Sequence, residues 1–175
     1  LRSGCPAFSP GAAARPPLAA SVHLVQALAV ADGRTGTLAV IPTDIDRERL
    51  LRANRTGDIR DMSAGPPLDE AAVSASTHIV AQIGEAPLIA ALQKGADVVV
   101  AGRCYDPAVF AAVPIMRGYP AGLSLHMGKI LECAAIATVP GSGSDCMFAT
   151  LDETGFTVET LSEERACTVT SVAAH

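Results

Sequence analysis

The chain has 175 residues, of which 49% are hydrophobic and 18% are charged, and its formal net charge is −5. This length is sufficient for one domain with a hydrophobic core. The acidic balance and the low aromatic content (four Phe, two Tyr, no Trp) exclude a basic nucleic-acid surface lined with stacking rings.

Targeting and membrane signals are absent from the sequence. No apolar run reaches the roughly 20 residues of a membrane-spanning helix, and the N-terminus does not resemble a signal peptide. The cysteines show no C-x-x-C spacing, so neither a disulfide framework nor a thiolate zinc site is predicted, and a cytoplasmic location is expected. Leu1 is not a start methionine and residues 167–175 show no cap or polar tail, so we expect a fragment of a longer protein.

The first half of the chain predicts mainly helices. Residues 1–18 are rich in proline and are expected to form a flexible N-terminal segment, followed by a single α/β domain over residues 19–175. Periodicity and turn residues predict four elements before residue 77: a helix over 19–31, a strand over 37–41, a helix over 45–53 capped by Asp44, and a helix over 68–76.

Residues 79–112 give the strongest fold signal, a strand–helix–strand–helix pattern. Strands are predicted over 79–83 and 97–101, with a helix over 85–94 between them, and Asp106 is predicted to cap the next helix. The second strand is apolar on both faces, which is typical of a covered parallel strand. We therefore predict a mostly parallel sheet with flanking helices in a three-layer arrangement; a partial barrel and an α+β domain are the alternatives.

The last third of the chain predicts a helix followed by a hairpin. The helix is expected over residues 121–138 and a glycine-rich loop over 139–144. Two strands, over 145–150 and 155–161, are expected to form a C-terminal β-hairpin.

Three candidate substrate-binding residues follow the second strand of this unit. Arg103, Tyr105 and Asp106 should lie beyond the carboxyl end of a parallel strand, where ligands bind in open α/β sheets. The Arg103 guanidinium could bind a carboxylate or phosphate, or form a salt bridge to Asp97 or Asp106. Asp106 could serve only as a helix cap, Tyr105 as a wall residue, and Cys104 as a packing residue.

The predicted helix over 121–138 carries three candidate catalytic residues. His126 and Lys129 lie one turn apart, which suits proton transfer and anion binding, although a surface pair is the alternative. Glu132 interrupts an apolar stretch, and a carboxylate there is costly to bury unless it is paired or functional. Lys129 is the expected partner of Glu132.

The glycine-rich loop adds further candidates. Gly141, Gly143 and Asp145 could cradle an anion with backbone N–H groups, but a simple connection into the hairpin explains the loop equally well. A mixed site of His126, Glu132, Asp145 and Cys146 lacks any known metal-ligand spacing, so no metal is predicted. The sequence identifies no cofactor.

Four segments together resemble the acyclic terpene utilisation protein family: GADVVVAGRCYDPAVFAA, HMGKILECAAIA, GSGSDC and the closing SVAAH. The resemblance extends from about Pro66 to the end, and its specific parts are the Gly-Arg step and the Leu-Glu-Cys helix. Met127 is a departure, because some members have His directly before the glycine, and it leaves the orientation of His126 open. The resemblance implies a catabolic, cytoplasmic protein of which these residues are the middle part.

The expected function is a lyase, hydratase or isomerase that acts on a small carboxylate or acyl-CoA-like anionic substrate. Arg103 would hold the anionic group, Glu132 or His126 would move a proton, and Lys129 would stabilise negative charge. The alternative is a non-catalytic interaction subunit, because the mean hydropathy of +0.33 suggests apolar surface buried against a partner. The expected partners are a second copy of the chain or the remainder of a longer one, with no nucleic acid and no membrane.

Overall fold

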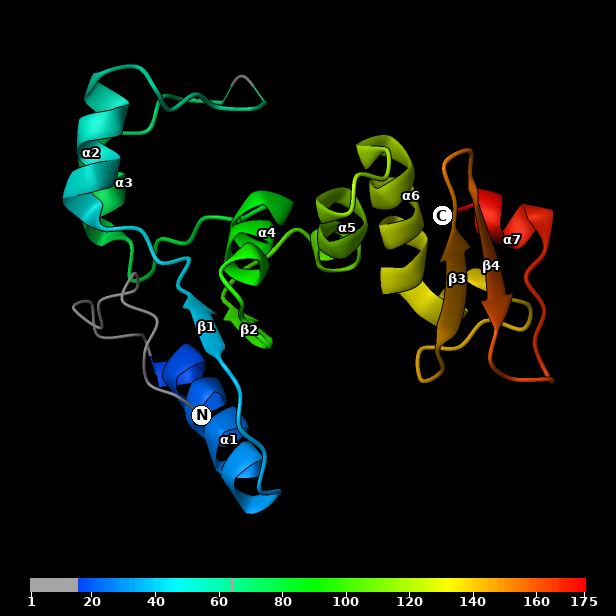
Figure 1. The fold of residues 1–175 in the computed structure, drawn as a ribbon. Helices are drawn as coiled ribbons and strands as arrows, with labels where there is room; N and C mark the ends of the chain where they lie inside the picture. The colour runs from blue at the N-terminus through cyan, green and yellow to red at the C-terminus, as the bar shows by residue number, and fades with distance from the viewer. Residues whose placement is uncertain (1–15, 64) are drawn as a thin grey trace. The chain divides into compact units, whose positions relative to one another are not determined.

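The described part of the chain is a mixture of helices and short strands (Figure 1). The structure is a computed structural model and describes residues 16–63 and 65–175. Its elements are α1 (Pro16–Ala31), β1 (Leu38–Ile41), α2 (Arg47–Arg55), α3 (Glu70–Ala75), α4 (Glu85–Gln93), β2 (Val98–Ala101), α5 (Asp106–Met116), α6 (Ala121–Cys133), the 3₁₀ helix η1 (Ala134–Ala137), β3 (Met147–Leu151), β4 (Phe156–Thr160) and α7 (Val169–Ala173).

These elements belong to two compact units. Of the described residues, one unit contains those of 16–82 and 98–103, and the other contains residues 83–97 and 104–175. Residues 1–15 of the predicted flexible segment lie outside the described residues, and residues 16–18 begin α1. The single domain predicted over residues 19–175 stays a prediction.

A parallel pair of strands organises the first unit. β1 and β2 pair in register from Leu38 with Val98 to Ile41 with Ala101, which confirms the two predicted strands and their parallel direction. Ile41 is buried, whereas Val98 is 42% exposed. The described residues show one parallel pair and one antiparallel pair, so the mostly parallel three-layer sheet is not confirmed.

The strand predicted over 79–83 is reduced to isolated bridges, so this prediction is wrong in extent. Val80 bridges Asp44 in the antiparallel sense, and Ile83 bridges Cys104 in the parallel sense. The physical reason is a change of partner within the stretch: Ala81 N donates to Thr43 O at 2.8 Å, whereas Ile83 O accepts from Tyr105 N at 2.8 Å, so neither pairing extends into a ladder.

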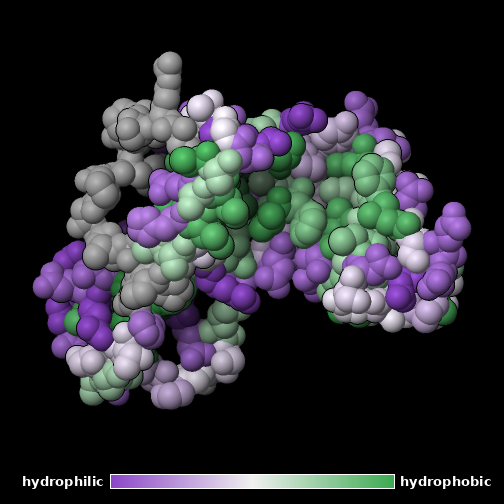
Figure 2. Space-filling view, turned by 90° about the horizontal axis from the view of Figure 1, so that it is seen from below, coloured by the Kyte–Doolittle hydropathy of each residue, from purple (hydrophilic) through white to green (hydrophobic). Residues whose placement is uncertain are grey.

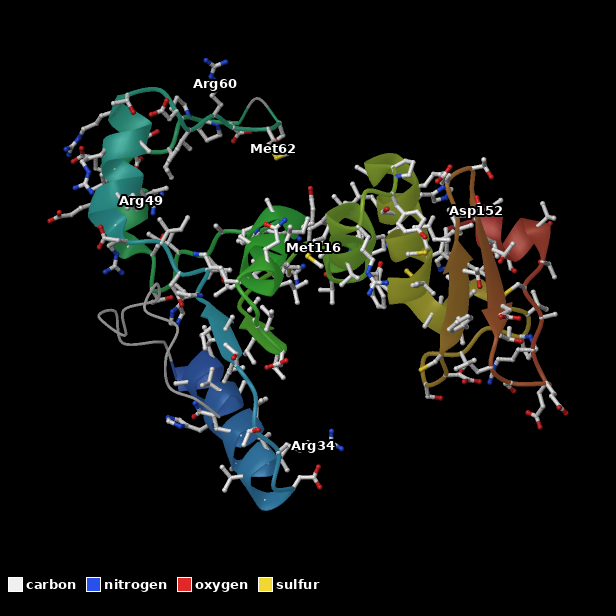
Figure 3. All side chains as sticks on the ribbon, in the orientation of Figure 1. Arg34, Arg49, Arg60, Met62, Met116 and Asp152 are labelled. Atoms are coloured by element: carbon white, nitrogen blue, oxygen red, sulfur yellow. The ribbon has the colours of Figure 1, made fainter. Side chains whose placement is uncertain are left out.

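Polar contacts hold α2 against α3 in the first unit. Asp46 caps α2 by accepting a hydrogen bond from Arg49 N at 3.0 Å, so the prediction of Asp44 as the cap is wrong by two residues. Arg55 Nε lies 2.8 Å from Glu70 Oε1 and ties the two helices together. Arg49 is exposed, as expected for a helix with no buried residue, and Arg60 in the segment after α2 is exposed as well (Figure 3).

Small residues allow α5 and α6 to approach closely in the second unit. Ala108 and Ala111 of α5 are fully buried, as is Ser124 of α6. A Cβ atom added to Gly128 of α6 would lie 2.6 Å from the carbonyl oxygen of Pro107, so the two backbones are almost in contact there. Glycine at position 128 is therefore required by packing, and this contact fixes the position of α6 against α5.

Both ends of α5 differ from the prediction. Tyr105 is the N-cap and Asp106 is the first helical residue, so Asp106 is not the cap. The helix continues through Pro114 to Met116, beyond residue 112 where the predicted strand–helix–strand–helix unit ends. Pro114 lies in the last turn, where its missing N–H interrupts little of the helical ladder.

The helix predicted over 121–138 ends early. α6 stops at Cys133, and Ala134 adopts φ 48°, which an L-residue rarely adopts and which stores backbone strain. The 3₁₀ helix η1 follows. The Thr138 hydroxyl then donates to Ala135 O at 2.8 Å, which turns the chain into the glycine-rich loop.

The predicted C-terminal hairpin is confirmed. β3 and β4 pair in the antiparallel sense, and Asp152 in the turn accepts from Thr154 N at 2.7 Å and from Gly155 N at 2.9 Å (Figure 3). The C-terminal residues, predicted to lack a cap, instead form α7, whose N-terminus carries a capping box between Thr168 and Ser171.

Hydrophobic side chains reach the surface of the molecule (Figure 2). On α5, Val109 is 59% exposed, Phe110 40% and Val113 37%. Within residues 16–63 and 65–175, none of the helices has both the length and the apolar character needed to span a membrane.

Two glycines of α6 provide a matched test of the close helix contact. Gly128→Ala is expected to destabilise the fold by about 1–3 kcal/mol, because its Cβ would meet the Pro107 backbone. Gly122→Ala has open space and is expected to be neutral or to stabilise by up to about 1 kcal/mol. Urea unfolding measures both changes, and equal effects of the two substitutions would contradict the packing account.

Candidate functional site

The last turn of α6 holds three polar side chains in mutual contact. Lys129 Nζ forms an ion pair and hydrogen bond with Glu132 Oε1. The Cys133 thiol donates to the same Glu132 oxygen at 3.1 Å, and Lys129 Nζ lies 3.5 Å from Cys133 Sγ. The predicted pairing of Lys129 with Glu132 is confirmed. We call these three residues the α6 cluster.

Helical spacing brings the α6 cluster together at the boundary of the core. Glu132 and Cys133 lie three and four residues after Lys129, which places all three on neighbouring positions of the helix surface. Ile130, between them in sequence, is buried. The Lys129 side chain is 44% exposed and that of Glu132 only 20%, so the carboxylate is largely shielded while the ammonium group reaches solvent.

Mutual hydrogen bonds determine the charge state of the cluster. The hydrogen bond from Lys129, followed by that from Cys133, lowers the pKa of Glu132. The hydrogen bond to Glu132 raises the pKa of Lys129, and burial, followed by the bond to Glu132, raises the pKa of the Cys133 thiol. At neutral pH the cluster is therefore a carboxylate, an ammonium group and a neutral thiol.

The lowered pKa of Glu132 also links the cluster to stability. Because folding lowers this pKa, the carboxylate contributes stability above the ordinary glutamate pKa of about 4.3. This contribution is lost as the pH falls through the lower pKa of the folded state.

His126 lies one turn before Lys129 but makes a different contact. Its ring meets Phe156 of β4 edge-on, with the ring centroids 5.1 Å apart and the planes at 88°. Among the described residues, no hydrogen bond joins His126 to the α6 cluster. The structure thus brings together Lys129 and Glu132 of the three predicted catalytic residues.

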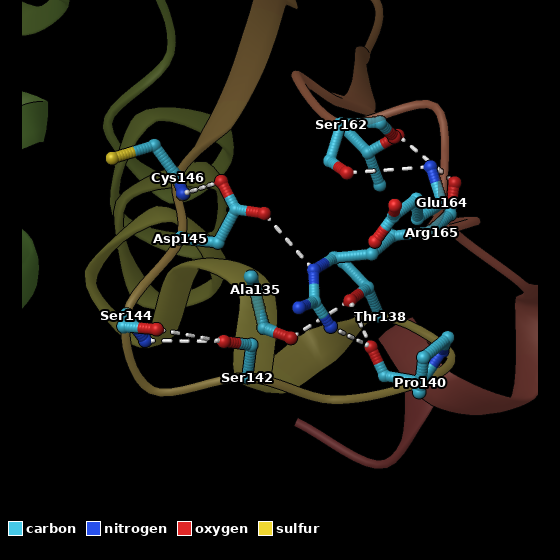
Figure 4. Close-up of polar contacts among 11 residues, drawn as sticks. Ala135, Thr138, Pro140, Ser142, Ser144, Asp145, Cys146, Ser162, Glu164 and Arg165 are labelled. Carbon is cyan, nitrogen blue, oxygen red and sulfur yellow. Dashed lines mark hydrogen bonds and ion pairs between the residues drawn. The ribbon is translucent and has the colours of Figure 1, made fainter.

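Asp145 is engaged in a structural network (Figure 4). Its Oδ2 lies 2.9 Å from Arg165 Nε and its Oδ1 accepts from Cys146 N at 2.8 Å. Arg165 also donates to Pro140 O at 2.6 Å. The Cys146 backbone N–H, followed by Arg165, lowers the pKa of the Asp145 carboxyl. This network holds the glycine-rich loop against the segment that follows β4.

Some polar groups of the glycine-rich loop already form hydrogen bonds within the protein. Ser142 N donates to Ala135 O at 2.9 Å, and the hydroxyls of Ser142 and Ser144 lie 3.2 Å apart (Figure 4). The anion-binding role of Gly141 and Gly143 stays a prediction.

The three residues predicted at the strand edge are divided between the units. Arg103 ends the first unit, and its backbone N–H donates to Thr43 Oγ1 at 2.8 Å. Tyr105 is 48% exposed in the second unit, and its N–H donates to Ile83 O at 2.8 Å. Burial, followed by the charge of Asp106, raises the pKa of the Cys104 thiol, which makes Cys104 a poor nucleophile.

Three residues with specific contacts were missed by sequence reasoning. Cys133 enters the sequence analysis only as part of the Leu-Glu-Cys helix, although its spacing from Lys129 indicates a contact. Thr43 could have been found as a polar residue that closely follows a parallel strand. No signal in the sequence indicates Arg165.

Within residues 16–63 and 65–175, no metal cluster is present, and a pocket of the first unit lies away from the predicted site residues. In the part of the chain that the structure describes, no three His, Cys, Asp or Glu side chains are placed to hold a metal ion. A pocket of about 190 Å³ lies in the first unit, lined by Ile45, Asp46, Arg47 and Ile79, and contains none of the predicted site residues.

The comparisons with known proteins place the chain in a family. The family model described as "Acyclic terpene utilisation family protein AtuA" matches residues 11–175, and the chain therefore belongs to this family. This membership suggests a role in acyclic terpene utilisation. Neither the curated proteins nor the solved structures include a match to the chain.

The Cys133 thiol reports on the charge state of the α6 cluster. Glu132→Gln should lower the thiol pKa and speed alkylation at pH 8 by roughly threefold or more, because one pKa unit changes the thiolate fraction tenfold. Lys129→Met should slow it, because Lys129 favours the thiolate. Peptide mass spectrometry after iodoacetamide treatment measures both rates, with the exposed Cys146 as internal control. Alkylation rates that change in the same direction in both variants would contradict the charge states assigned to the α6 cluster.

Proposed function

We propose that this protein is a catabolic enzyme of acyclic terpene utilisation that moves a proton on a small carboxylate or acyl-CoA-like substrate. The observation that carries the proposal is the α6 cluster, in which a shielded carboxylate contacts an ammonium group and a thiol. Family membership supports the metabolic role. The reaction class is lyase, hydratase or isomerase.

The three groups suit removal of a proton next to a carbonyl. Glu132 is ionised at neutral pH and can accept the proton. Lys129 is protonated and partly exposed, so it can stabilise the negative charge that develops on the carbonyl oxygen. The Cys133 thiol orients the carboxylate through its hydrogen bond. His126 remains a second candidate for carrying the proton onward.

Substrate binding is proposed separately for each unit from its own geometry. In the first unit, Arg103 is the proposed anion-binding side chain, because it follows a parallel strand and carries a guanidinium. In the second unit, Tyr105 and Asp106 are further candidates, and Asp145 acts on the loop of Gly141 and Gly143 through its pair with Arg165.

The proposed setting is the reducing cytoplasm. The four cysteines in the described part of the chain are all free thiols, in keeping with a reducing compartment. We also propose that the protein forms a homo-oligomer.

Glu132→Gln is the most direct test of the proposed chemistry. The variant keeps the shape of the side chain but removes the base, so turnover should fall by at least about 100-fold. Short branched carboxylates and their CoA thioesters are incubated in D₂O, and mass spectrometry detects deuterium exchange or addition of water. Lys129→Met should lower the same rate.

The matched control is Glu163→Gln, an exposed position outside the cluster. It should retain wild-type turnover. Full activity of a folded Glu132→Gln variant would rule out the proposed base.

A second candidate function is a non-catalytic interaction subunit. The exposed Val109, Phe110 and Val113 on α5 favour it, because large apolar side chains on one helix often mark an interface. We expect this face to bind a second copy of the chain.

Light scattering with Val109→Glu distinguishes this candidate. A dimer that becomes a monomer in the variant would support the interaction role, with Glu153→Gln in the hairpin turn as control. A wild-type monomer that binds no dye for exposed apolar surface would contradict it.

A further inference from the structure

The carboxyl ends of β1 and β2 are locked together in the first unit. Gly102 N donates to Ile41 O at 2.9 Å, which continues the strand pairing to the end of β2. One residue further on, Arg103 N donates to the hydroxyl of Thr43 at 2.8 Å. The backbone that carries the Arg103 side chain is thus held by a side chain from the neighbouring strand end.

Thr43 is itself rigidly placed. It is only 6% exposed, and its carbonyl oxygen accepts a hydrogen bond from Ala81 N at 2.8 Å. The hydroxyl has therefore little freedom to follow a displaced Arg103.

Gly102 makes this contact possible. A Cβ atom at position 102 would lie 2.2 Å from Thr43 Oγ1 and 3.1 Å from Thr43 Cβ. The threonine side chain therefore occupies the space that any larger residue at position 102 would need. Thr43 and Gly102 fit each other as a pair, and the result is a defined turn at the strand edge.

The turn fixes the backbone from which the Arg103 side chain extends into solvent. Arg103 is exposed, whereas its backbone N–H is part-buried in the bond to Thr43. A guanidinium on a fixed backbone loses less conformational entropy on binding a planar anion than one on a mobile loop. The carboxyl edge of a parallel pair is where such a ligand binds.

We infer that Thr43 is the positioning residue of an anion-binding site at the carboxyl edge of β1 and β2, in which Arg103 binds a carboxylate or phosphate. The inference rests on the substrate-binding role proposed for Arg103. It adds Thr43 and Gly102 as the residues that determine how well Arg103 binds the anion.

The test is an NMR titration of the ¹⁵N-labelled 175-residue chain with three probes: butyrate, inorganic phosphate and coenzyme A. The reporter is the Arg103 side-chain Nε–H resonance, which should shift saturably in the wild type and be missing in Arg103→Gln. If only butyrate shifts the Arg103 resonance, the ligand is a carboxylate. If phosphate and coenzyme A shift it, the ligand is the phosphate end of an acyl-CoA.

Two substitutions at Thr43 separate positioning from a general structural role. Thr43→Ser keeps the hydroxyl and should bind the effective probe within about twofold of the wild type. Thr43→Val keeps the shape but removes the acceptor, so its Kd should rise roughly fivefold to tenfold, in keeping with the loss of one hydrogen bond. Gly102→Ala, which displaces the Thr43 hydroxyl by contact, should weaken binding similarly and provides the test if Thr43→Val fails to fold.

Wild-type affinity in folded Thr43→Val or in Gly102→Ala overturns the inference and leaves the proposed role of Arg103 intact. A wild-type chain whose Arg103 resonance responds to no probe overturns both. The proton-transfer role of Glu132 is measured separately by deuterium exchange, so its failure is distinguishable from either result.

Discussion

The backbone contact between Gly128 of α6 and Pro107 of α5 is the constraint on which the second unit depends. It requires a residue without a side chain at position 128 and small residues such as Ala108 on the facing helix. Glu132 lies one helical turn beyond Gly128 on the helix that this packing fixes, and its side chain is only 20% exposed. Lys129 reaches the Glu132 carboxylate from the solvent side. Its ammonium group replaces part of the water that would otherwise solvate the carboxylate, and Glu132 therefore stays ionised.

A similar close contact organises the first unit on a smaller scale. Gly102 leaves space for the Thr43 side chain, and Thr43 in turn holds the backbone of Arg103. In each unit, a glycine permits a close contact, and a charged residue follows that glycine in sequence: Arg103 follows Gly102, and Glu132 follows Gly128. The chemistry proposed for the protein rests on these two charged positions, Arg103 and Glu132, each argued from the contacts of its own unit.

The sequence predicts features that depend on neighbouring residues. The strands around Val40 and Val99, the hairpin and the Lys129–Glu132 pair all follow from local periodicity or spacing, and the structure confirms them. Features that depend on distant residues were missed: the Thr43 contact joins positions 60 residues apart, and the Asp145–Arg165 pair joins positions 20 apart. The end of α6 was also missed, because the positive φ of Ala134 has no signature in an alanine-rich stretch.

The central claim is that Lys129 holds Glu132 as an ionised base inside a shielded cluster. A ¹³C NMR titration of the Glu132 side-chain carboxyl measures this directly, with Lys129→Met as the comparison. The account predicts a pKa below the ordinary value of about 4.3 in the wild type and a clear rise in the variant. A wild-type carboxyl that titrates above its ordinary value, or a pKa that Lys129→Met leaves unchanged, would contradict the account.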